Sequence, residues 1–159
     1  MNRRLLAIYL NDHLAGSTLG LELARRALRE NRGTAFGAFL DGLAREIAED
    51  RESLQRLMEA LAIPRSHVKP ALAVAAERIG RLKLNGSVRS YSPLSRLLEL
   101  EGLTIGVEGK LAMWRNLKEA VALPPGGPDL EELIARGERQ RAELERRRVE
   151  AAKLALGPD

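Results

Sequence analysis

Residues 34–62 read TAFGAFLDGLAREIAEDRESLQRLMEALA, and this stretch decides the fold. Its apolar residues recur at alternating steps of four and three, which places them along one face of a long helix. The members of this stripe are Phe36, Leu40, Leu43, Ile47, Leu54, Leu57 and Leu61. Asp50 is the only charge within it. Because such a stripe must be covered by other apolar surface, the stretch predicts a helix bundle.

The flanking sequence predicts four further helices, over about 3–30, 66–84, 93–123 and 129–156. Asn31-Arg32-Gly33 ends the first helix, and Pro64 follows the second. Ser92-Pro93 is a typical pairing of an N-cap with a first-turn proline, and Asp129 precedes the last helix in the same way. No strand alternation and no internal repeat is present. We therefore expect one all-α domain over residues 1–159.

Composition narrows the function classes. The chain has 159 residues, 45% hydrophobic but only 3% aromatic, so its core must consist of aliphatic side chains. It has no cysteine, which excludes disulfides and cysteine-ligated metal sites. The net charge of +4 is modest and spread along the chain, so nucleic-acid binding is not expected. No apolar run reaches the roughly 20 residues of a membrane span, and the first residues do not form a signal peptide. We expect a cytoplasmic protein.

The connections predict how the helices are arranged. The links after the 3–30 helix and after the 93–123 helix are short, whereas about 30 residues separate the 34–62 and 93–123 helices. A short link joins antiparallel neighbours, and a long one allows the chain to return to the opposite end. The result is a hairpin, a crossover that carries its own short helix, and a second hairpin.

In helix number, length and order the chain resembles the ferritin-like superfamily. It is also similar to a group of small uncharacterised bacterial ferritin-like proteins, through residues 9–16 (YLNDHLAG) and 99–110 (ELEGLTIGVEGK). The resemblance implies a ferritin-like four-helix bundle with an additional short helix in the crossover. In metal-binding members, two helices each supply one Glu and the other two each supply Glu-x-x-His. This chain has no Glu-x-x-His on its 34–62 or 129–156 helix.

Several polar residues fall on the predicted inner faces, where charge is costly unless it is paired or bound to metal. Helix register places four of them in one layer and the other two, Glu101 and Arg148, in a second layer. Two arginines and three acidic residues nearly neutralise one another, which favours a buried salt-bridge network and no cofactor. The complete set is His13, Asp50, Glu101, Glu108, Arg141 and Arg148.

The alternative for the same residues is a one-metal site. A histidine with carboxylates can bind iron or manganese, and the candidate ligands are His13, Glu46, Asp50 and Glu108. Against this alternative, Arg141 would place a cation in the layer and repel a divalent ion.

Glycines on two helices form a second pattern. Gly16 and Gly20 share a face of the 3–30 helix, and Gly102, Gly106 and Gly109 share a face of the 93–123 helix. Each costs about 1 kcal/mol relative to alanine in a helix interior. Two interpretations account for them: close packing of helix backbones, or a groove that admits a ligand or a partner helix.

These observations lead to three functional hypotheses. The first is a non-catalytic ferritin-like protein with a degenerate metal centre, whose role is binding or assembly and which could form a homodimer. The second is a metal handler or oxidoreductase with one iron or manganese ion. The third is a small-ligand binder that uses the glycine-lined groove. The sequence identifies no protein partner.

Overall fold

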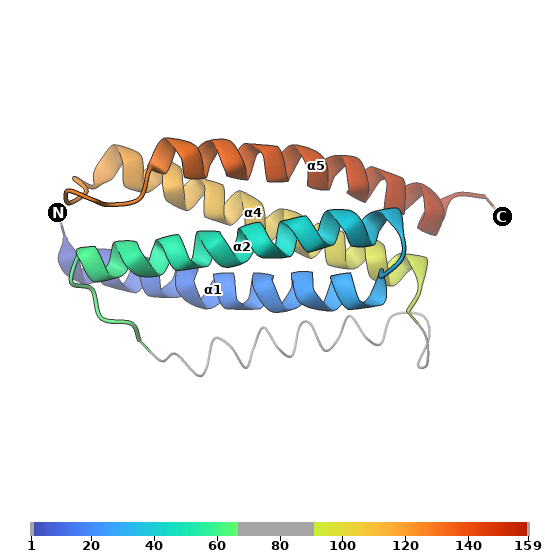
Figure 1. Cartoon of the computed structure of the whole chain (residues 1–159), viewed down its shortest axis with the longest axis horizontal. Helices are drawn as coiled ribbons and strands as arrows, with labels where there is room; N and C mark the ends of the chain where they lie inside the picture. Colours follow the sequence, from blue (N-terminus) through green and yellow to red (C-terminus); the bar gives the residue numbers. More distant parts are fainter. Residues whose placement is uncertain (1, 67–90, 159) are drawn as a thin grey trace.

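Four long helices form a bundle in the computed structural model, which describes residues 2–66 and 91–158 (Figure 1). They are α1 (Arg3–Glu30), α2 (Ala35–Ala60), α4 (Pro93–Ala120) and α5 (Leu130–Leu156). The all-α bundle predicted from the sequence is therefore confirmed. The predicted helix over 66–84 falls almost wholly outside the described residues. No helix in the described part of the chain is both long and apolar enough to cross a membrane.

The helix starts follow the capping signals in the sequence. The Ser92 side chain accepts a hydrogen bond from the Ser95 amide, and Asp129 accepts from the Glu131 and Glu132 amides. Thr34 accepts from the Gly37 amide in the same way. Each of these bonds satisfies an amide that would otherwise lack a partner in the first helical turn. The predicted starts at Pro93 and near Leu130 are thus confirmed.

Helices α1 and α5 run in one direction, and α2 and α4 run in the other (Figure 1). Helix α1 packs against α2 and α4, while α5 packs closely against α4 and more loosely against α2. Helices α2 and α4 therefore stand on one diagonal of the bundle and are parallel. This arrangement agrees with two hairpins joined by a long connection.

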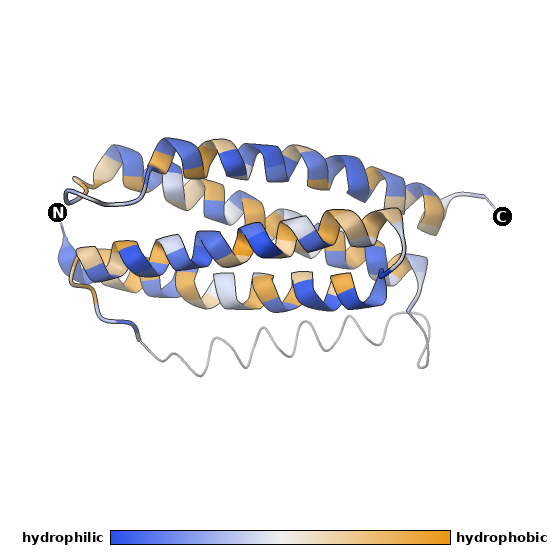
Figure 2. Ribbon diagram, in the orientation of Figure 1, coloured by the Kyte–Doolittle hydropathy of each residue, from blue (hydrophilic) through white to orange (hydrophobic). Residues whose placement is uncertain are grey.

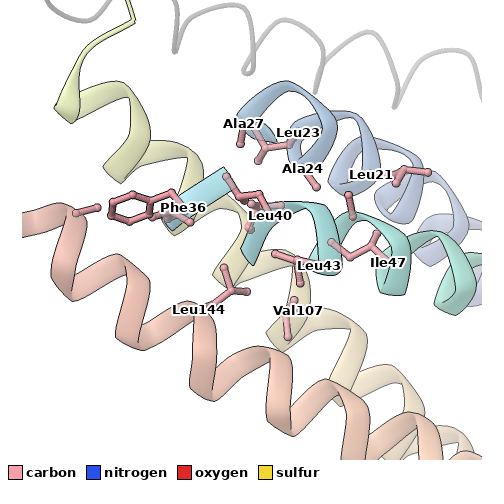
Figure 3. Packing of buried hydrophobic residues seen from close by; sticks show 14 of the residues in the cluster. Leu21, Leu23, Ala24, Ala27, Phe36, Leu40, Leu43, Ile47, Val107 and Leu144 are labelled. Atoms are coloured by element: carbon pink, nitrogen blue, oxygen red, sulfur yellow. The ribbon is translucent and has the colours of Figure 1, made fainter. Parts of the chain in front are cut away.

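The buried apolar residues form two clusters along the bundle axis. One surrounds Phe36, Leu40 and Leu144 near the α1–α2 turn, and side chains from all four helices meet there (Figure 3). The other surrounds Leu57 and Trp114 near the opposite end. Charged residues occupy much of the remaining helix surface, most of all on α5 (Figure 2). The layer between the two clusters is where the polar residues and a cavity are found.

Candidate functional site

A cavity of about 290 Å³ opens between α1 and α4 in the middle of the bundle. Its floor includes Ile47 and Leu54 of α2, and its walls include Leu103 and Trp114 of α4. Ile105 also lines it and is 74% exposed, which places this side chain at the mouth. Most of the lining is apolar, as is typical of small-molecule sites, and the volume lies close to the lower end of their usual range.

Four of the five glycines singled out in the sequence line this cavity: Gly16, Gly20, Gly106 and Gly109. A Cβ atom built at any of them would meet no other atom within 4 Å outside its own stretch of helix. Gly102 differs, because a Cβ there would lie 3.0 Å from Cδ2 of Leu23. Close packing therefore accounts for Gly102, whereas the other four expose helix backbone to open space.

A buried salt-bridge network lies beside the cavity and is centred on Asp50, whose residue surface is 2% exposed. Lys110 of α4 donates hydrogen bonds to Oδ2 of Asp50 and to Oε1 of Gln140. Arg136 of α5 lies 2.6 Å from the other Asp50 oxygen. Gln140 also donates to Glu46 over 2.8 Å. These contacts tie α2, α4 and α5 together within one layer.

The network reaches the surface on one side and the cavity on the other. Arg136 also contacts Glu49 over 2.7 Å, and the Glu49 side chain is largely exposed. Lys110 and Asp50 line the cavity. Burial lowers the pKa of the Lys110 ammonium, and the neighbouring Asp50 carboxylate opposes that shift. A charged pair at the wall of an apolar cavity is the main electrostatic feature of the site.

The structure brings together a different set of residues from the predicted one. Of the six predicted members, Asp50 alone belongs to this buried network. Glu108 and Arg141 lie at the surface, with side chains 49% and 44% exposed and 3.8 Å apart. Arg141 contacts Glu138 more closely, over 2.6 Å. The expected central layer of His13, Asp50, Glu108 and Arg141 is therefore corrected.

The second predicted layer also differs. Arg148 pairs with Glu145 of its own helix over 2.7 Å. Among the described residues, the ion-pair partner of Arg148 is therefore Glu145 and not Glu101. The rotation of α5 accounts for its two arginines, because its buried face includes Leu133, Gln140 and Leu144. Glu108 likewise lies outside the buried residues of α4.

A signal for the correct face exists in the sequence. Leu133, Gly137, Gln140 and Leu144 are spaced by four, three and four, and Arg136 precedes Gln140 by one turn. This spacing places Arg136 and Gln140, and not Arg141, on the buried side of α5. Lys110 carries no comparable signal, since its helix is apolar over a wide arc.

The candidate metal ligands are not gathered in one place. Asp50 is paired with Lys110 and Arg136, Glu46 accepts from Gln140, and Glu108 lies at the surface. Within residues 2–66 and 91–158, no group of three or more acidic or histidine side chains is arranged to hold a metal ion. In this layer the Asp50 carboxylate lies next to the cationic side chains of Lys110 and Arg136, not next to other metal ligands.

His13 lies in the cavity wall on α1. Its ring packs edge-on against Tyr9, with centroids 4.6 Å apart. Burial lowers the pKa of His13, and Asp12 opposes the shift. The imidazole is therefore neutral at neutral pH and belongs to the cavity rather than to the salt-bridge network.

A second buried network, which the sequence analysis missed, joins the start of α4 to the end of α1. Glu99 is 1% exposed, lies 3.1 Å from Arg26 and accepts a hydrogen bond from the Tyr91 hydroxyl. Tyr91 in turn accepts from Asn31, which also accepts from Arg96. Burial raises the pKa of both Glu99 and Tyr91. This network fixes one end of the bundle and lines no described cavity.

No protein-family model matches the chain, and no curated protein or solved structure shows significant similarity to it. The case for a function therefore rests on the cavity and on the charges around it.

Proposed function

We propose that this protein binds a small, largely apolar molecule in the cavity between α1 and α4, in a non-catalytic role. The observation that carries the proposal is that four helical glycines line one cavity and have no neighbouring side chain where their own would be. Of the three functional hypotheses, ligand binding is the one that uses this space.

The energetics favour a ligand over simple packing. Glycine in a helix interior costs about 1 kcal/mol relative to alanine, so Gly16, Gly20, Gly106 and Gly109 together cost about 4 kcal/mol. Close backbone packing offsets such a cost only where atoms of a neighbouring helix fill the space. That happens at Gly102, against Leu23, and not at the other four. A bound molecule in contact with the exposed backbone would supply the missing contacts.

We further infer that the bundle is ferritin-like, with a salt-bridge network in place of a metal centre. Two antiparallel hairpins joined by one long crossover are the topology of that superfamily, and its metal sites are built in the bundle core. Asp50, Lys110, Arg136 and Gln140 occupy the corresponding central layer here. In this proposal the charges hold α2, α4 and α5 in register while the neighbouring cavity binds the ligand. A homodimer and a cytoplasmic location stay predictions.

The proposal is tested with a neutral hydrophobic fluorophore, N-phenyl-1-naphthylamine, titrated into the wild-type protein and two variants. Gly106→Leu fills the cavity and is expected to reduce probe affinity at least tenfold. Gly42→Leu is the matched control, because Gly42 is a glycine of α2 that also has open space around its Cβ position but does not line the cavity. Circular dichroism establishes that both variants remain helical. Equal probe affinity in Gly106→Leu and Gly42→Leu would overturn the proposal.

A further inference from the structure

Three of the polar residues that line the cavity carry hydrogen-bond donors and no acceptor in their side chains: Arg51, Lys110 and Trp114. Lys110 has three N–H groups, of which two are used, by Asp50 and Gln140. Trp114 is fully buried, and its indole Nε1 has no hydrogen-bond partner among the described residues. Asp50, which also lines the cavity, already has a cation at each oxygen. The lining residues therefore include N–H donors that have no protein acceptor.

Arg51 of α2 adds an uncompensated charge to the lining. It is partly buried, and its Nε donates to Oγ1 of Thr18 over 3.3 Å. It forms no ion pair with any residue of the described ranges 2–66 and 91–158. A guanidinium has five N–H donors in a planar fork that matches a carboxylate. Its terminal nitrogens are thus available to an acceptor within the cavity.

The lining has two acidic residues, Asp12 and Asp50, and two basic ones, Arg51 and Lys110, and Arg51 is the base that forms no ion pair among the described residues. The charge of Asp50 is offset by Lys110 on one oxygen and by Arg136 on the other. His13 is neutral at neutral pH, for the reason given above. Asp12 is the other acidic residue of the lining, and it is exposed, where water screens its charge. Arg51 therefore has no buried anion that competes for it in the cavity.

We propose that the ligand is a small apolar acid, bound as its carboxylate, with Arg51 as the ion-pair partner and the glycine-lined wall against the apolar part. This inference rests on the proposed function and adds the chemical class of the ligand. A charge-assisted pair between guanidinium and carboxylate is among the stronger polar contacts, and it is stronger still beside an apolar wall.

Octanoate and 1-octanol test this inference, because they share a chain and differ in charge. Calorimetric titration compares wild type with Arg51→Met, which keeps an unbranched stem, and with Arg45→Met. Arg45 is the matched control: it lies on the same helix, is exposed, pairs with Asp41 and does not line the cavity. We expect Arg51→Met to weaken octanoate binding about tenfold or more, and a tenfold loss corresponds to about 1.4 kcal/mol. Octanol binding should weaken less than twofold, because the alcohol carries no charge. Arg51→Lys should recover part of the octanoate affinity.

The outcomes separate the two proposals. If octanol binds and octanoate does not, or if Arg51→Met weakens both equally, the carboxylate inference is overturned while the cavity remains a binding site. If neither compound binds to wild type and the neutral fluorophore also fails, both proposals are overturned. Equal losses in Arg45→Met and Arg51→Met would show a general charge effect and would also overturn the inference.

Discussion

Lys110 on α4 donates a hydrogen bond to Asp50 on α2, across the diagonal of the bundle. The two helices make no close backbone contact, so this pair is reached only by a long side chain. Because Asp50 also pairs with Arg136 of α5, one carboxylate holds two cations. The pair is therefore asymmetric: removing the anion leaves two cations without it, whereas removing Lys110 leaves Asp50 with Arg136.

The first prediction follows from that asymmetry. Asp50→Asn should lower the free energy of unfolding by about 3 kcal/mol, since it leaves Lys110 without its ion-pair partner and Arg136 with only the largely exposed Glu49. Lys110→Met should cost less, about 1–2 kcal/mol, which is ordinary for a point mutation. Urea unfolding followed by circular dichroism measures both. A larger loss in Lys110→Met than in Asp50→Asn would contradict the arrangement.

A second prediction concerns Arg141. Its side chain is 44% exposed and pairs with Glu138 and Glu108 at the surface. Exposed pairs contribute about 0–1 kcal/mol, so Arg141→Ala should change the free energy of unfolding by less than about 1 kcal/mol. Arg136→Ala, on the same helix but in the buried network, should cost clearly more. Similar urea midpoints for these two variants would refute the assigned rotation of α5.

Replacement of glycine by alanine should have opposite effects on stability at Gly137 and at Gly106. A Cβ at Gly137 would lie 2.7 Å from Cδ2 of Leu111, so Gly137→Ala should destabilise by about 1–3 kcal/mol through overpacking. Gly106 has open space, and Gly106→Ala should stabilise by about 1 kcal/mol through helix propensity. Thermal unfolding of the two variants tests this prediction, and stabilisation in both would show that α4 and α5 are further apart than described.

The pH dependence of stability should reveal His13. Because its folded-state pKa is lowered below 6.5, the unfolded state binds more protons in this range. The resulting stability is present above pH 6.5 and is lost as the pH falls through the folded-state value. Burial at Glu99 gives the opposite slope, since its raised pKa favours the folded state at low pH and that stability is lost as the pH rises above about 4.5.

Comparison of the wild type with His13→Asn separates the pH-dependent contribution of His13 to stability from that of Glu99. The difference in unfolding free energy between wild type and this variant should shrink as the pH is lowered from 7.5 to 5. Asparagine keeps a polar side chain beside Tyr9 and does not titrate. A difference that stays constant over this range would show that His13 is not desolvated.

The helices were predictable because their ends are set by local chemistry, as at Ser92-Pro93 and Asp129, where a cap and its amides lie within three residues. The inner face of α5 was assigned wrongly, because the charges of Arg141 and Arg148 were given more weight than the spacing of Leu133, Gln140 and Leu144. Arg141 and Gln140 differ by one residue, or about 100°, and that step separates the surface from the core. The contact between Asn31 and Tyr91 joins residues 60 apart, which no local pattern reveals.

The division of the apolar interior into two clusters has a consequence for cooperativity. Each end of the bundle has its own buried core, and Ile134 of α5 packs against both of them beside the polar layer and the cavity. An occupant of the cavity would contact Ile47 and Leu103 on one side and Leu54 and Trp114 on the other, and would thereby add apolar contacts between the two cores. Binding would then raise stability by mass action and also couple the opening of the two ends, so amide exchange at both would slow together.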